Sequence, residues 1–461
     1  MAWSVWCTIV EQLRPAFSRR RTHLWFLAAL AAFAIREDLN GVTSFVRVLG
    51  LEPVFYHSLL RMFHSSAIDL PRLSELWTRA AIRLLSGHLV TVKGMLVLAT
   101  DGVKVAKSGR KMPAVKTIHQ ESDSNTKPEY ITGHSCQSVS LLAQRNGAAA
   151  AVPIGTSISE GVKFGNGDRR TIFDVTLSFL DDVNIGQAFI LLADAYYGCW
   201  KMARGCLRRG AHLLTRVRSN AVAYLVPEVV SGRRGRPRTY GKKVRLRDTF
   251  KDADGWAEAD IELYGERCHA RYKSADLMWR PAGALVRFVF VVLDGTSKCM
   301  FMSTDTRLDP LEIVHLYSLR FKIETGFKVA KHVTGGVLYH FWMMAMDRLG
   351  RHPKTQYLHR KSEHYRDMVR RKLRAYHCFL QAGVIAQGLM TAIGIVAASF
   401  CWSNYTSWMR TMNTSRIPSE WVVQHVLRKS FPELLANASG MPDWVKFIAE
   451  KTGLSQLAKV A

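Results

Sequence analysis

The chain lacks paired cysteines and is poor in acidic residues. Its eight cysteines stand singly, at positions 7, 136, 199, 206, 268, 299, 378 and 401. Without a Cys-x-x-Cys pair, neither a zinc site nor a disulfide framework is signalled, and we expect a reduced protein of the cytoplasm. Against 37 Asp and Glu the chain carries 64 Lys and Arg, a formal net charge of +27. This excess predicts a polyanionic partner, with nucleic acid the leading candidate and an anionic membrane surface the weaker one.

Two apolar runs have the look of targeting or membrane segments. Leu24–Ile35 starts deep in the chain, has no small-residue cleavage pattern and is followed at once by charged residues, so a signal peptide is disfavoured. Residues 379–402 are long enough to cross a bilayer, but they contain Gln381 and Gln387. We therefore favour a buried core helix for 379–402 over a membrane span.

The length and the periodicity of the sequence predict a mixed α/β protein of several parts. A chain of 461 residues exceeds what one core usually supports. Residues 1–88 have helical patterns, with helices predicted over Leu24–Ile35, from Thr43 and over Leu73–Leu85. From Gly94 the pattern changes to strands, in the order β-β-β-α-β-α-β up to residue 220. The second and third of these strands form a hairpin through Asn146-Gly147.

Two acids follow apolar, β-branched runs of the predicted sheet. Asp101 follows "MLVLAT" and Asp194 follows "FILLA". The carboxyl edge of central strands is where α/β proteins place chemistry. The alternative for Asp194 is a turn residue or a helix N-cap, which a single acid after a strand usually is.

A third acid lies within an unusual stripe of charges. Tyr317, Arg320, Glu324 and Lys331 fall within roughly 60° of one another on one predicted helix. Three acids on two strands and a helix can hold Mg²⁺, and two such ions activate a water or hydroxyl and stabilise the leaving oxygen in phosphodiester cleavage. The neighbouring donors would then hold DNA phosphates beside Asp101, Asp194 and Glu324. The alternative is a solvated helix face with paired charges.

These residues resemble a known family. Tyr317, Arg320, Glu324 and Lys331 match without a gap the Tyr-x2-Arg-x3-Glu-x6-Lys signature of one branch of the DDE transposases of bacterial insertion sequences. The stretches "SGRKMP", "KPEYITGHS" and "GRPRTYG" also look like those of DDE superfamily endonucleases. The resemblance covers roughly residues 20–400.

The resemblance implies a ribonuclease H-like core, with Asp101 on its first strand and Asp194 at the end of its fourth, and a mostly β insertion between Asp194 and Glu324. It further implies cleavage at the inverted-repeat ends of the transposon with two Mg²⁺ ions per site, for which Mn²⁺ can substitute, and attack of the freed 3′-OH on target DNA. In relatives the signature Tyr, Arg and Lys contact phosphates, and a flipped base rests on an aromatic side chain, for which Trp256 and Trp279 are the candidates here.

The resemblance and the patterns together predict five parts and a location. These are a helical DNA-binding domain (1–88), the first part of the core (89–220), a basic β-rich insertion (221–302), the second part of the core with the catalytic helix (303–402) and a C-terminal helical region (403–461). A homodimer is expected from the family because two DNA ends must be paired, and so is a cytoplasmic, nucleoid-associated location in a bacterium.

Further basic residues are candidates for DNA contact. Residues 201–250 hold 14 Lys and Arg against Glu228 and Asp248, and within them Arg233, Arg234, Arg236 and Arg238 suit phosphates or a minor groove. Lys328, near the signature, is another candidate, and the basic segment 351–374 suits a DNA backbone or is a surface loop.

Two further interpretations stay open at this stage. His119, His134, His269 and His340 lack ligand spacing and are expected to be structural or DNA-facing. The alternative to an active transposase is a catalytically inactive, transposase-derived DNA-binding repressor, which would not need three acids.

Overall fold

The computed structural model describes residues 1–39, 41–120, 128–228, 238–263, 265–406, 412–437 and 441–452. Its contacts divide the chain into two compact units. Unit 1 comprises Met1–Leu89, Gly102–Ile185 and Ile323–Ala461, and unit 2 comprises Val90–Asp101 and Gly186–Lys322. The protein is therefore mixed α/β, with a large mixed sheet and helices toward both ends of the chain. The five-part division predicted above stays a prediction.

The first 89 residues of unit 1 are helical, as the sequence pattern predicts. The helices are α1 (Ala2–Glu11), α2 (Arg20–Ile35), α3 (Thr43–Val48), α4 (Tyr56–Phe63) and α5 (Leu70–Leu84), with short 3₁₀ turns η1 (Arg14–Ala16) and η2 (Pro53–Phe55). Helix α5 begins three residues before the predicted Leu73. The Asp69 side chain caps its first turn by accepting from the amide of Arg72, and Pro71 occupies that turn, where a missing N–H costs nothing.

Unit 1 also contains the hairpin predicted at Asn146-Gly147. Its strands are β4 (Tyr130–Arg145) and β5 (Ala148–Ile158), beside β3 (Lys116–His119) and the second half of β2 (Met95–Ala106). Asn146 and Gly147 have φ values of 49° and 76°, as a two-residue hairpin turn requires. Helix α6 (Ile172–Val183) follows, and the capping box of Thr171 and Asp174 sets its first turn.

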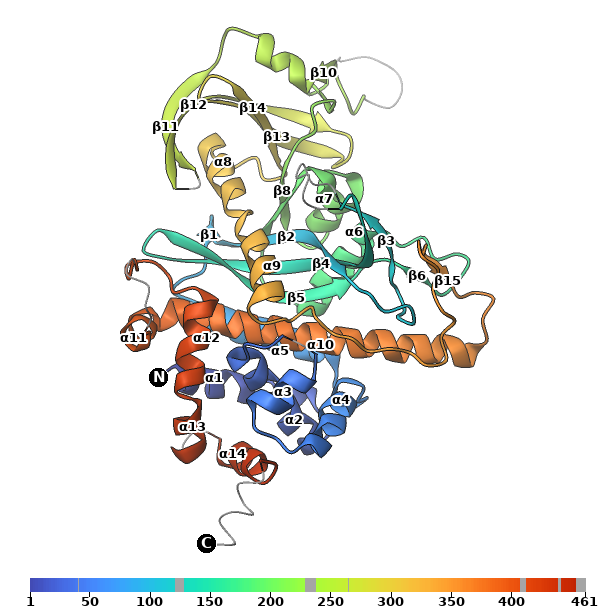
Figure 1. Cartoon of the computed structure of the whole chain (residues 1–461). Coiled ribbons are helices and arrows are strands. Elements are labelled where there is room, and N and C mark those ends of the chain that lie inside the picture. Colours follow the sequence, from blue (N-terminus) through green and yellow to red (C-terminus); the bar gives the residue numbers. More distant parts are fainter. Residues whose placement is uncertain are drawn as a thin grey trace, which may run out of the picture. The chain divides into compact units, whose positions relative to one another are not determined.

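The long helix α10 (Glu363–Val396) forms the core of unit 1. It packs against β5 on one side and against α2 and α5 on the other (Figure 1). By length and composition it could cross a membrane, but 94% of its apolar window is buried inside the protein, so it is a core helix and not a span. Gln381 and Gln387 donate to the carbonyls of Ile154 and Gly326, which satisfies both buried amides.

The boundaries of α10 correct two expectations. The helix ends at Val396 and a separate helix α11 (Ala398–Asn404) follows, so 379–402 is not one helix. At its other end α10 includes half of the basic segment 351–374, since Ser362 caps its first turn. Residues 363–374 are thus ordered helix, not a surface loop. The last helices are α12 (Glu420–Lys429), α13 (Phe431–Asn437) and α14 (Pro442–Ala449).

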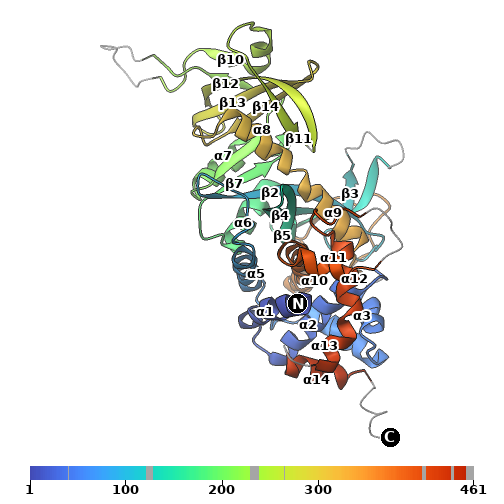
Figure 2. The same ribbon diagram turned by 90° about the vertical axis from the view of Figure 1, so that its left-hand side faces the viewer.

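Unit 2 is built on parallel strands extended by antiparallel ones. The first half of β2 pairs in parallel with β7 (Phe189–Ala193), and β7 pairs in parallel with β8 (His212–Arg216). Beyond β8 the sheet continues through β14 (Ser297–Ser303), β13 (Ala284–Leu293) and β12 (Glu266–Trp279), all antiparallel. Figure 2 shows these strands of the predicted β-rich insertion, 221–302, with α8 (Pro310–Leu319) against them.

The remaining elements of unit 2 are short. They are the strands β1 (Thr91–Val92), β9 (Val222–Tyr224), β10 (Lys243–Arg245) and β11 (Ala257–Leu263), the helix α7 (Trp200–Leu207), and the 3₁₀ turns η3 (Ala195–Tyr197) and η4 (Leu246–Lys251). In unit 1, β6 (Val162–Lys163) pairs in parallel with β15 (Gln356–Tyr357). The predicted order β-β-β-α-β-α-β corresponds to β2, β4, β5, α6, β7, α7 and β8, and the structure adds the short strands β3 and β6, which the prediction lacked.

Candidate active site

Asp101 and Asp194 lie at the same level of two neighbouring parallel strands in unit 2. The register pairs Ala99 of β2 with Leu192 of β7, and each aspartate lies two residues beyond its member of that pair. Neighbouring strands lie about 4.8 Å apart, and residues two apart share a face. The two carboxylates are therefore side by side at one edge of the parallel strands, as the position of chemistry in α/β sheets requires.

Asp101 differs in one respect from the sequence expectation, whereas Asp194 agrees with it. Asp101 does not end its strand, because β2 continues to Ala106. Asp194 does follow its strand, and it also caps η3, accepting from the amide of Tyr196 at 2.9 Å. The helix-cap interpretation is thus confirmed, and it leaves lone pairs of the same carboxylate for the predicted metal ligation.

A guanidinium is bound to the first aspartate. Arg320 Nη1 donates to Asp101 Oδ2 at 2.8 Å, with 14% and 19% of the two side chains exposed. The positive charge offsets the repulsion between two adjacent carboxylates. Arg320 thus already serves the acids of the site, in addition to the phosphate contact expected from the signature.

Two phenols, Tyr197 and Tyr317, are influenced by the charge of these acids. Burial raises the pKa of Tyr197, and the negative charges of both Asp101 and Asp194 raise it further. Burial also raises the pKa of Tyr317, with Asp194 adding to the shift while Arg320 and Arg216 oppose it. Both shifts agree with the strand register, which brings Asp101 and Asp194 to one edge of the sheet.

The sequence analysis missed three members of this cluster. Tyr197 belongs to η3, and Thr215 and Arg216 end strand β8. The Thr215 hydroxyl donates to the Asp194 carbonyl at 2.6 Å and so fixes the turn that carries this acid. The available signal was that β8 is the next parallel strand after Asp194, whose carboxyl end must reach the same edge.

The stripe predicted on one helix is divided between two helices. Helix α8 ends at Leu319 and α9 (Lys322–His332) begins three residues later. The amide of Arg320 bonds to the carbonyl of Tyr317, three residues back, and this tight turn closes α8. Tyr317 and Arg320 belong to unit 2, whereas Glu324 and Lys331 belong to unit 1. The prediction of a single helical stripe was wrong.

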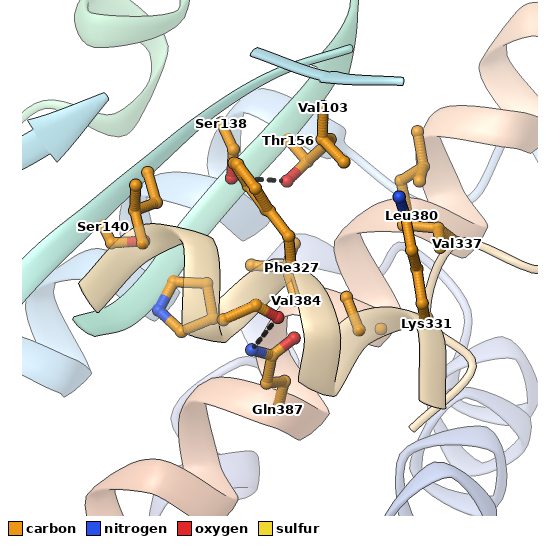
Figure 3. A pocket seen from close by; sticks show the side chains of 16 residues that line it. Val103, Ser138, Ser140, Thr156, Phe327, Lys331, Val337, Leu380, Val384 and Gln387 are labelled. Atoms are coloured by element: carbon orange, nitrogen blue, oxygen red, sulfur yellow. Dashed lines mark hydrogen bonds between the residues drawn. The ribbon is translucent and has the colours of Figure 1, made fainter. Parts of the chain in front are cut away.

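In unit 1, α9 carries the other signature residues. Glu324 lies in its first turn, where a negative charge is favourable to the helix dipole. The Lys331 ammonium donates to the backbone carbonyl of Lys104 in β2 at 3.1 Å, and Lys328 is exposed. Gln387 of α10 donates to the Gly326 carbonyl at 3.0 Å, beside a small apolar cavity of about 30 Å³ under α9 (Figure 3). Helix α9 is thus tied to β2 and to α10 by side-chain donors.

The acids present suit a hard cation. Carboxylate oxygens on neighbouring strands are the ligands that Mg²⁺ prefers, and Asp101 already accepts a cationic donor in Arg320. Within the residues that the structure describes, no group of three or more His, Cys, Asp and Glu side chains stands in metal-binding arrangement. The metal site of Asp101, Asp194 and Glu324 stays a prediction.

A cavity of about 240 Å³ opens beside Asp194 in unit 2. Ala195, Thr215, Arg216 and Arg218 line it together with the nearly buried Trp279, which is 5% exposed. Trp256 lies elsewhere in the insertion, where its indole donates to the Asp252 carbonyl. Of the two tryptophans considered, Trp279 is therefore the one that shares a cavity with residues next to an acid.

The other predicted contacts have mixed outcomes. Arg238 is exposed, while Arg233, Arg234 and Arg236 lie outside the described residues. His134 is structural as expected: it is fully buried between the Tyr339 hydroxyl, at 2.7 Å, and the Pro113 carbonyl, at 2.9 Å.

Comparison with known proteins supplies the family. The family profile described as DDE superfamily endonuclease matches residues 12–281, more than half of the 461-residue chain. The match includes Asp101, Asp194 and Trp279 and ends before α9. A search of curated proteins returned no match. The mixed α/β structure is compatible with a DDE nuclease fold. Enzymes of this superfamily are transposase-like nucleases that act on DNA and generally use divalent metals. The chain belongs to the DDE superfamily endonucleases.

Proposed function

We propose that the protein is a DNA transposase of a bacterial insertion sequence, in the Tyr-x2-Arg-x3-Glu-x6-Lys branch. It binds the inverted-repeat ends of its element, cuts them and joins the freed 3′-OH to target DNA. The observation that carries the proposal is the pair Asp101 and Asp194 at one level of adjacent parallel strands, with Arg320 bound to the first. A binding module has no need of adjacent, half-buried carboxylates, because like charges destabilise the fold.

The order of elements from β2 to β8 supports a ribonuclease H-like core as part of this proposal. Asp101 and Asp194, with Glu324 as the third acid, would hold two Mg²⁺ ions. Bound there, the ions supply an activated water or hydroxyl and stabilise the leaving 3′ oxygen. Glu324 is included because it occupies the Glu position of the signature. The proposed phosphate contacts are Tyr317, Arg320, Lys328 and Lys331. Two chains would pair two ends as a homodimer, in a nucleoid-associated complex.

The cavity beside Asp194 supports a finer proposal for the DNA end. A flipped base would enter this cavity and rest against Trp279, while Arg216 and Arg218 hold the adjacent phosphates. We propose Trp279 over Trp256 for this role because Trp256 is engaged with Arg271, whose guanidinium lies 4.8 Å from its ring centroid.

The decisive experiment is cleavage of DNA carrying the sequences that flank the gene, with Mg²⁺ or Mn²⁺. We expect Asp101→Ala, Asp194→Ala and Glu324→Ala to abolish strand cleavage while binding of the ends is largely kept. Undiminished cleavage by Glu324→Ala with Mg²⁺ would remove Glu324 from the acid set. Specific binding by the natural chain with no cleavage under any metal condition would indicate the repressor instead.

A second experiment tests the phosphate contact of Lys331. Its ammonium donates to the Lys104 carbonyl, and an ammonium has further protons to offer a phosphate. We expect Lys331→Ala to weaken the end complex and to lower the salt slope of binding by about one. An unchanged slope would confine Lys331 to its bond with β2.

A further inference from the structure

Two loops of unit 1 are joined into one surface that the proposed chemistry does not use. The first connects β2 to β3 and the second connects α9 to α10. We call residues 107–116 and 340–354 together the Trp342 platform. The amide of Met343 bonds to the Lys111 carbonyl at 2.9 Å and that of Leu349 to the Arg110 carbonyl at 2.8 Å. The Lys111 ammonium donates in return to the Met344 carbonyl at 3.0 Å, so the loops support each other.

Side chains of the second loop alternate between core and solvent. Met343 and Met346 are each 4% exposed and pack in a hydrophobic cluster with Leu358. Trp342, just before Met343, and Met344, between the two buried methionines, point outward and are 64% and 85% exposed. Neighbouring large apolar side chains held in water mark a surface that meets a partner.

The position of the indole is set by a glycine. A Cβ on Gly109 would lie 3.2 Å from Trp342 Nε1 and 2.5 Å from Met112 Sδ, so the absence of a side chain lets both approach the loop. The indole edge therefore rests against the first loop while most of the side chain remains accessible. A ring held in this way loses little conformational entropy when a planar group stacks on it.

The surroundings of the two apolar side chains are basic. Exposed cations of the platform are Arg110, Lys111, Arg348, Arg351 and Lys354. The acid between them, Asp347, is paired with Lys361 at 2.8 Å. Two copies of so basic a surface repel each other, whereas a polyanion with flat apolar groups fits both features.

We propose that the Trp342 platform is a second DNA-binding surface, on which Trp342 stacks against an unstacked base and Met344 enters between base pairs as a wedge. Arg110 and Lys111 hold the phosphates on either side. Aromatic platforms and apolar wedges with flanking cations are the means by which proteins bind and bend DNA without reading its sequence. The inference rests on the proposed function only for the identity of the polyanion.

The test uses the full chain with a fluorescein-labelled 40-base-pair duplex, without metal, so that cleavage plays no part. We expect Trp342→Ala to weaken binding about tenfold, since a stacked base contributes a salt-independent share of the affinity. The slope of log affinity against log salt concentration should be the same for Trp342→Ala as for the natural chain. Arg110→Ala should instead lower the slope by about one. The matched control is Trp421→Ala in α12, a tryptophan that is 46% exposed on the same unit.

A second readout follows the bases directly. With 2-aminopurine at alternate positions of the duplex, the natural chain should raise the fluorescence as bases unstack, and Met344→Ala or Trp342→Ala should reduce that rise. Unchanged affinity and fluorescence in Trp342→Ala would overturn the inference and leave the proposed function intact. A natural chain that fails to bind DNA at low salt would overturn the proposed function itself. A dimer that Trp342→Ala dissociates, with DNA affinity unchanged, would make the platform an interface between copies and also overturn the inference.

Discussion

At the scale of single residues, the bond between Asp101 and Arg320 joins the fold to the proposed chemistry. Both side chains are largely buried, and a second carboxylate, Asp194, directly follows the neighbouring strand β7. A guanidinium held there compensates the negative charge of two acids that we propose as metal ligands. Arg320 would have to leave Asp101 for a phosphate when DNA and metal bind, which requires that the pair be worth only a few kcal/mol.

We therefore expect Arg320→Ala to lower the free energy of unfolding by roughly 1–3 kcal/mol at pH 7, because Asp101 loses a charged, part-buried partner. Chemical denaturation measures this. The double variant Arg320→Ala/Asp101→Asn should regain part of the loss, since no carboxylate then needs compensation. Strictly additive effects would show that the two side chains do not interact in solution.

A buried histidine gives unit 1 a dependence on pH. Burial lowers the pKa of His134 to about 3. Its Nε2–H donates to the Pro113 carbonyl and its Nδ1 accepts from the Tyr339 hydroxyl, the neutral tautomer. Below pH 6.5 the unfolded chain takes up a proton that the folded chain refuses, so stability falls with pH from about 6.5 toward 3. His23 and His377, whose pKa values burial lowers to about 4, act in the same direction.

The expected loss from His134 alone between pH 6.5 and pH 4 is roughly 2–3 kcal/mol. Denaturation midpoints at several pH values should show a shallower decline for His134→Phe than for the natural chain, even though the variant starts from lower stability. His364→Gln, an exposed position, should keep the full decline. Parallel curves for His134→Phe and the natural chain would exclude His134 as a source of the pH dependence.

At the scale of elements, α9 depends on a close approach of backbones that only glycine allows. A Cβ on Gly383 of α10 would lie 2.5 Å from the Gly336 Cα and 2.8 Å from its carbonyl oxygen, just after α9 ends. Backbone atoms cannot rotate away as a side chain can. The position of α9, which carries Glu324, is therefore fixed by this contact and by the hydrogen bond from Gln387 to the Gly326 carbonyl.

Gly383→Ala should lower the free energy of unfolding by about 2–4 kcal/mol, because α10 and the segment after α9 must separate. If Glu324 acts as proposed, cleavage should fall more than DNA binding does. Gly350→Ala is the control, since nothing lies within 4 Å of its added Cβ. Equal stability of the two variants, measured by thermal or chemical unfolding, would contradict the close approach.

At the scale of the whole molecule, the charge of +27 predicts binding that depends on salt. For six to ten phosphate contacts, DNA affinity should fall by about 10³–10⁵ between 50 and 200 mM salt. Fluorescence anisotropy with duplex DNA measures it. Because the apolar window of α10 is buried inside the protein, we also expect the protein to be extracted from cells without detergent. A DNA affinity that does not change with salt would contradict the first expectation. Partition of the protein into membranes would contradict the second.

Features that depend on residues close together in the chain could be predicted from the sequence, and the break between α8 and α9 could not. The helices of residues 1–89, the hairpin at Asn146-Gly147 and the position of Asp194 after its strand depend on periodicity and turn residues, which are local. The break between Leu319 and Lys322 was missed because Tyr317 to Lys331 keeps helical spacing throughout. Only the tight turn at Arg320 shows that α8 stops there.

The sequence by itself determined the class of the protein, because net charge, residue spacing and family motifs are properties of the chain alone. It also determined which acids to consider. Only the tertiary structure decided that Asp101 and Asp194 stand at one level, that Arg320 binds the first, and that Trp279 lines the same cavity as Arg216 at the end of β8. These are relations between segments far apart in the chain, which depend on strand register and packing and leave no mark on local sequence pattern.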